Sequence, residues 1–193
     1  MSMRSLNSLL LVIFTAASLT FATSAVMAAD GQDKFYGSYV GSGTAERINE
    51  NVTEKRDLDV TVAPFKEGGF TVKWITVVRG ADGERVGDDV KRREVEENFI
   101  PLEDKDDVFI LAPKGGLFQK AELPNPLRGE PMRWATIEDG AMTVYSMAIS
   151  ANGGSELQVY RRTLTEKGMD ISFLRMQDEK VELRLEGTLV RTK

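Results

Sequence analysis

The 193-residue chain contains no cysteine and no histidine. The first absence excludes disulfides and cysteine-linked lipid anchors, and the two together exclude Ser-His-Asp and Cys-His nucleophile systems and histidine-ligated zinc or haem. Carboxylate, lysine, tyrosine or arginine chemistry would still be possible, but it would require strongly shifted pKa values. The composition therefore favours a protein that is not an enzyme, and we expect no cofactor and no metal site.

The chain also lacks an excess of positive charge, with 25 basic against 30 acidic residues and a net charge of −5. Nucleic-acid binding requires a concentrated basic face that displaces counterions from phosphates. We therefore expect no nucleic-acid partner.

The first thirty residues have the pattern of an export signal. Arg4 provides a positive start, residues 9–19 form an apolar run, and small residues follow as far as Val26-Met27-Ala28. A membrane anchor needs about 20 predominantly apolar residues, whereas this run is interrupted after about ten. The pattern predicts a signal peptide over residues 1–28, no membrane span after its cleavage, and a periplasmic or secreted protein.

The remaining residues, 29–193, are predicted to form a single domain, because this is the usual length of one domain. Their hydrophobic pattern has a period of two: Leu58, Val60 and Val62 alternate with polar residues in "RDLDVTV". Only "KRREVEEN", residues 91–98, could instead be helical, and we favour a strand. Similar segments, separated by turn residues, are found at 35–46, 69–79, 90–100, 108–112, 133–137, 142–149, 156–164, 169–176 and 181–190.

Glycines are concentrated in the first of these segments, "FYGSYVGSGTAE", where Gly37, Gly41 and Gly43 lie within a dozen residues. A phosphate-binding loop requires G-x-G-x-x-G followed by a helix, and neither the spacing nor the helix is present. Within a strand, glycine marks a bulge or a sharp bend where strands approach closely. We therefore interpret this segment as a strand at a barrel corner.

One long segment breaks the alternation. Residues 113–131 contain four of the six prolines and three glycines, so they can continue neither a strand nor a helix. Loops of this length are uncommon unless they cover something. Two interpretations remain open: a lid that places Leu117 and Phe118 over an opening, or a loop packed across a sheet face.

About 8–10 antiparallel strands in hairpin order predict an all-β fold, a single meander closed into a β-barrel, with a sandwich as the alternative. Gly37-Ser38-Tyr39 on the first strand and Arg191 on the last resemble the calycin group, the lipocalin-like and fatty-acid-binding-like barrels. The resemblance implies that Arg191 packs over the aromatic ring, although tyrosine replaces the expected tryptophan. Segments such as "WITVVR" and "ELQVYRRTL" are also similar to a family of exported proteobacterial proteins, which implies no functional residue.

A barrel of this size has room for side chains or for one small ligand. Arg161 is in phase with Leu157 and Val159, and Arg175 with Phe173, so strict alternation predicts that both guanidinium groups point inward, where they could clamp a carboxylate. The alternative is that each arginine lies near a strand end with its head in water. The predicted ligand-binding residues, for which ordinary packing is the competing explanation, are Arg161, Arg175, Trp74, Trp134, Tyr145 and Tyr160.

These observations lead to two hypotheses about function. The first is an exported barrel that binds a small lipophilic or weakly anionic molecule. The second is an envelope protein-interaction module whose barrel is solid and filled with side chains, with a partner docked on its outer face. A contiguous exposed apolar patch would favour the second.

Overall fold

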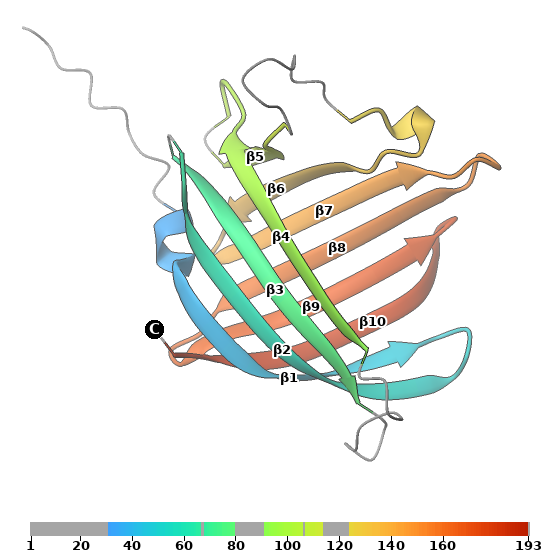
Figure 1. Ribbon diagram of the computed structural model, residues 1–193, viewed down its shortest axis with the longest axis horizontal. Helices are drawn as coiled ribbons and strands as arrows, with labels where there is room; N and C mark the ends of the chain where they lie inside the picture. Colours follow the sequence, from blue (N-terminus) through green and yellow to red (C-terminus); the bar gives the residue numbers. More distant parts are fainter. Residues whose placement is uncertain (1–30, 67, 80–90, 106, 114–123, 193) are drawn as a thin grey trace, which may run out of the picture.

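The computed structural model describes residues 31–66, 68–79, 91–105, 107–113 and 124–192, which form a closed barrel of ten antiparallel strands (Figure 1). The strands are β1 (Gly37–Arg47), β2 (Val52–Phe65), β3 (Gly69–Arg79), β4 (Arg92–Pro101), β5 (Val108–Leu111), β6 (Met132–Glu138), β7 (Ala141–Ile149), β8 (Ser155–Leu164), β9 (Gly168–Gln177) and β10 (Lys180–Arg191). Two short 3-10 helices accompany them, η1 (Gln32–Phe35) and η2 (Pro126–Arg128).

The topology is the simplest closed meander. Each strand pairs with its neighbours in sequence, and the sheet is closed by antiparallel pairing of β1 with β10. The predicted all-β barrel is therefore confirmed, and the sandwich alternative is excluded. Residues 92–98 belong to β4, so the charged segment is a strand. The described chain contains no helix long and apolar enough to cross a membrane.

Some predictions concern residues beyond the described ranges. The signal peptide, residues 1–28, lies outside them, as do Leu117 and Phe118 of the proposed lid. The division of the chain into a leader and one domain remains a prediction.

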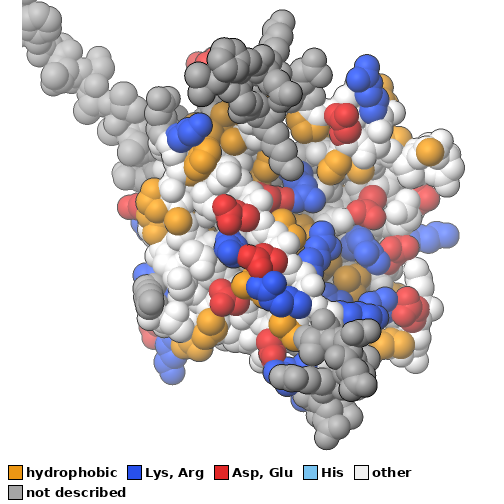
Figure 2. Space-filling model, viewed as in Figure 1, with side chains coloured by type: hydrophobic (Ala, Val, Ile, Leu, Met, Phe, Trp, Pro, Cys, Tyr) orange, Lys and Arg blue, Asp and Glu red, His pale blue; other side chains and the backbone are white. Residues whose placement is uncertain are grey.

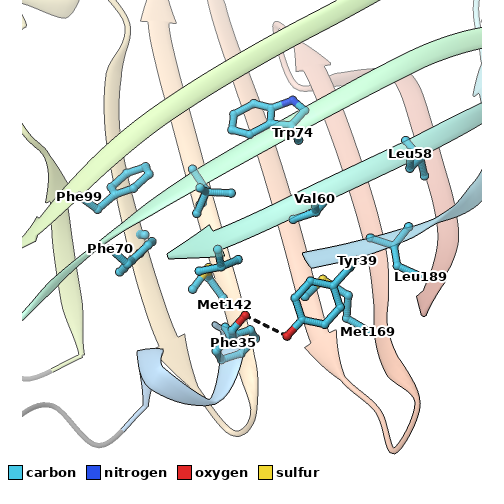
Figure 3. Packing of buried hydrophobic residues seen from close by; sticks show 14 of the residues in the cluster. Phe35, Tyr39, Leu58, Val60, Phe70, Trp74, Phe99, Met142, Met169 and Leu189 are labelled. Carbon is cyan, nitrogen blue, oxygen red and sulfur yellow. Dashed lines mark hydrogen bonds between the residues drawn. The ribbon is translucent and has the colours of Figure 1, made fainter. Parts of the chain in front are cut away.

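One end of the barrel is filled with apolar side chains. Phe70 stacks on Phe99 with ring centroids 5.2 Å apart and meets Phe109 edge-on at 4.9 Å, and all three rings are fully buried. At the same end, η1 adds the buried ring of Phe35 to this core (Figure 3). Gln32 of η1 donates a hydrogen bond to the carbonyl oxygen of Gly68 at 3.0 Å. We call this the sealed end.

The seam between β1 and β10 is exceptionally close. Gly43 pairs with Gly187, and a Cβ atom added at Gly41 would lie 2.1 Å from the carbonyl oxygen of Thr188. A side chain at Gly41 or Gly43 would force the strands apart, which confirms that these two glycines allow β1 and β10 to approach closely.

Charged and aromatic side chains join the first and last strands at this seam. Arg191 lies over the Tyr39 ring, 5.2 Å from its centroid, and its Nε donates to the Tyr39 hydroxyl at 3.1 Å. That hydroxyl in turn donates to the carbonyl oxygen of Phe35 at 2.9 Å (Figure 3). The packing implied by the calycin resemblance is therefore present.

Candidate ligand-binding cavity

The other half of the barrel interior contains a cavity of about 290 Å³. Strand alternation supplies its walls, because every second residue of a strand points to the same face. Its apolar floor is formed by Leu58, Val60 and Leu185, which adjoin the core of the sealed end. The described residues that line the cavity include no aspartate or glutamate. We call the half of the barrel that contains this cavity the open end.

An aromatic wall crosses the cavity. The Trp74 ring on β3 lies 5.4 Å from the Tyr160 ring on β8, and Tyr160 lies 4.4 Å from Phe173 on β9. Barrel closure brings these strands to opposite sides of one interior, so rings far apart in sequence come into contact. The wall offers a flat apolar surface to a ligand.

Arg162 is the most unusual residue of the cavity. Its side chain is 4% exposed, and its guanidinium lies over the Trp74 ring, 5.5 Å from the centroid. One of its terminal nitrogens, Nη1, is buried without a hydrogen-bond partner, and within the described chain Arg162 forms no ion pair.

Burial determines the electrostatic state of Arg162. It lowers the pKa of the guanidinium to about 10, because a charge is poorly solvated there, yet the group remains a cation at neutral pH. An unpaired buried charge costs several kcal/mol of desolvation. An anion bound beside Arg162 would offset this cost.

The phenol of Tyr160 is fixed by a short hydrogen-bonded row along β8. Its hydroxyl donates to Oε1 of Gln158 at 2.6 Å, and Gln158 donates to Glu156. Burial raises the pKa of Tyr160, against the opposing effect of the arginines around it, so the phenol is neutral at physiological pH. Tyr160 therefore holds its proton and can accept a hydrogen bond from a ligand.

Other arginines around the open end already have carboxylate partners. Arg47 and Arg56 share Glu54, at 3.1 and 2.9 Å. Arg175 contacts Glu182 through its Nε at 3.2 Å.

A fourth such pair, between Arg133 of β6 and the buried Glu97 of β4, spans the region beside the short strand β5. Burial and the nearby charge of Arg93 lower the pKa of Arg133. Arg93 itself is exposed, lines the cavity and forms no ion pair with the described residues. The cavity therefore has a positive electrostatic character that its neighbouring acids offset only in part. Figure 2 shows basic and acidic side chains side by side on the face in view.

Four of the six predicted ligand-binding residues line this cavity: Trp74, Tyr160, Arg161 and Arg175. Arg175 points inward as predicted, but its ion pair with Glu182 makes it a weaker anchor than Arg162. Whether any of these residues binds a ligand remains a prediction.

The orientation predicted for Arg161 is wrong. Arg161 borders the cavity, but it is exposed and its Nη1 donates to the hydroxyl of Thr143 at 3.5 Å. Because Tyr160 and Arg162 point inward, Leu157, Val159 and Arg161 face outward. The physical reason is that β8 has apolar residues on both faces, so alternation alone did not indicate which face was the interior.

Trp134 and Tyr145 do not line the cavity. They pair across β6 and β7 and stack at 5.0 Å with nearly parallel rings, out of phase with the buried Ala135 and Val144. They therefore lie on the outer face of the barrel.

Sequence reasoning missed Arg162 as an inward arginine. The signal was present, because one member of the consecutive pair Arg161-Arg162 must point inward, and Arg162 is in phase with Tyr160. The described residues contain no cluster of three or more acidic or metal-ligating side chains suited to a metal ion.

No protein-family model and no curated protein matches this chain. Among solved structures, the chain is similar to the S-type phycobiliprotein lyase CPES from Guillardia theta, with 11% sequence identity, a TM-score of 0.39, and coverage of 84% of this chain and 90% of that chain. A likeness of this degree carries no conclusion about the chemistry of the cavity.

Proposed function

We propose that this barrel binds a small amphiphilic acid in the cavity of its open end, and that binding rather than turnover is its activity. The observation that carries the proposal is the buried cation of Arg162, which lacks a carboxylate partner among the described residues and faces an aromatic wall. A carboxylate or similar anion would pair with Arg162, while the apolar part of the ligand would lie against Trp74, Tyr160 and Phe173.

The presence of a cavity disfavours the alternative of a solid barrel filled with side chains. About 290 Å³ is at the lower end of the usual range for small-molecule pockets, which supports a compact ligand rather than an interior filled by side chains. Turnover is disfavoured because the chain has no histidine or cysteine, and because Glu54, beside the cavity-lining Arg47 and Arg56, is held in ion pairs with both.

Export is part of the same proposal. The pattern of residues 1–28 supports delivery to a periplasmic or external compartment, where a binding barrel would sequester or carry its ligand. Amino-terminal sequencing of the protein recovered from its native host would test this. A chain that begins near residue 29 is expected, and an intact leader would contradict export with cleavage.

The two tryptophans provide a direct test of binding. Trp74 lies in the cavity and Trp134 on the outer face, so in the Trp134→Phe variant the emission reports on the cavity alone. We expect decanoate to change this emission and to bind at least about tenfold more tightly than decanol, because only the acid can pair with Arg162.

Neighbouring arginines give a matched control. Arg162→Met should remove the preference for decanoate over decanol, whereas Arg161→Met, which removes the adjacent outward charge, should preserve it. Equal binding of acid and alcohol by the parent protein would contradict the proposal, as would equal losses in the two variants.

A further inference from the structure

The outer face of β6–β10 has an apolar stripe that the cavity does not explain. The strands β6–β10 follow one another in the sheet (Figure 1), and their pairing aligns the residues of the stripe in two rows that run across the strands. The first row is Trp134, Tyr145, Val159 and Leu174, and the second is Met132, Met147, Leu157, Met176 and Val181. We call these nine residues the outer stripe.

The side chains of the outer stripe are only partly covered. Met132 is 39% exposed, and the other eight are half-buried. The outer face of β2–β4 is different, because it has ion pairs such as Lys73–Glu94 at 2.6 Å. Contiguous apolar patches on a protein surface mark interaction sites more often than chance exposure does.

The dimensions of the outer stripe fit one helix. Adjacent strands lie about 4.8 Å apart, so five strands span about 19 Å, and rows two residues apart are separated by about 7 Å. A helix is about 10 Å wide and rises 1.5 Å per residue, so about 13 residues would cover the stripe. A stable dimer buries about 800 Å² on each partner, more than this stripe offers, which disfavours a second copy of the chain.

The composition of the outer stripe fits the same occupant. Three of its nine residues are methionines, whose flexible side chains adapt to irregular apolar surfaces and are common where helices are bound. The stacked pair of Trp134 and Tyr145 adds a rigid aromatic anchor.

Two arginines at the border of the outer stripe indicate the charge that a partner would carry. Arg184 continues the first row on β10 by pairing with Leu174, and Arg161 lies one row nearer the sealed end. Both are exposed, and neither has an ion-pair partner among the described residues. We propose that the outer stripe docks an amphipathic helix of a partner protein, with its apolar side on the stripe and acidic residues toward Arg161 and Arg184.

Two labelled peptides of about 14 residues test this proposal. Both have leucines at helical spacing on one side, and the flanking positions are glutamate in one and lysine in the other. Fluorescence anisotropy should show that the glutamate peptide binds at least about tenfold more tightly. Binding should also shift the Trp134 emission of the Trp74→Phe variant, because only the outer tryptophan remains.

Matched variants locate the binding site. Leu157→Glu, at the centre of the outer stripe, should abolish peptide binding, whereas Val190→Glu, at a 52% exposed apolar position of β10 outside it, should not. Arg184→Glu should reduce the preference for the glutamate peptide. Decanoate binding should persist in all three variants, because this proposal does not depend on the cavity.

Several results would overturn the proposal. These are absence of binding by both peptides, equal binding of the two, and insensitivity to Leu157→Glu. A dimer in sedimentation, or binding to anionic lipid vesicles, would also overturn it if Leu157→Glu abolished that association, because the occupant would then be a second copy or a membrane.

Discussion

The sealed and open ends of the barrel are built by the same strands but use their inward positions differently. On β3, Phe70 is fully buried at the sealed end, while Trp74, four residues further along the strand, faces the cavity. On β9, the buried Met169 gives way to Phe173 and then Arg175. The sealed end buries apolar side chains, whereas the open end has arginines around a cavity.

If the proposed ligand binds, this difference separates the residues that stabilise the fold from those that bind the ligand within one sheet. Apolar burial contributes about 25 cal/mol per Å², so the aromatic cluster of the sealed end favours folding. The buried cation of Arg162 opposes it, because desolvation of a charge without a partner is unfavourable. Retention of such a residue is expected where it serves a ligand rather than the fold.

The largest expected effect of a substitution on the free energy of unfolding is at the sealed end. Phe70→Ala should lower the free energy of unfolding by about 3–5 kcal/mol, because it leaves a cavity between Phe99 and Phe109. Denaturant titration measures this loss. The half-buried Phe173 at the open end provides the comparison, and a loss in Phe173→Ala as large as that in Phe70→Ala would break the distinction between the two ends.

A smaller effect of opposite sign is expected at the open end. Arg162→Met should raise the free energy of unfolding by about 1–4 kcal/mol, because an apolar side chain replaces a desolvated charge. The same titration, performed without ligand, measures the gain. Destabilisation would mean that Arg162 supports the fold, and the distinction between the sealed end and the open end would then not hold.

The smallest effect is expected on the outer face. Asp57 accepts a hydrogen bond from Nε of Arg79 at 2.6 Å, but both groups are well solvated. Asp57→Asn should leave the denaturation midpoint unchanged within experimental error, and added salt should not alter this result, because exposed pairs contribute little. A clear loss of stability would show that the charged outer face supports the fold as well.

The fold was predictable because alternation is a local property. Leu58, Val60 and Val62 indicated β2, and the turn residues indicated where each strand ended. The predicted segments lie within a few residues of the observed strands, and the pairing of neighbours follows from short connections. Even the contact between Arg191 and Tyr39 was implied by the calycin resemblance.

The site was only partly predictable, for two physical reasons. On β6, β7 and β8, apolar residues occupy both faces, so alternation predicts an inward position for Arg161, Trp134 and Tyr145, which lie on the outer face. The second reason is that ion pairing depends on other strands: Glu182 satisfies Arg175, whereas no described residue does so for Arg162. The periodicity of a sequence describes one strand at a time, so it does not indicate which side chains of different strands form ion pairs.

The contact between Tyr39 of β1 and Arg191 of β10 has a consequence for biosynthesis. Its two residues are 152 positions apart, and the strand that completes the ring of hydrogen bonds is the last one to leave the ribosome. Until then β1 has an unpaired edge, which can associate with other chains. Closure therefore has to follow translation, and the partly synthesised chain has to be kept from aggregating in the meantime.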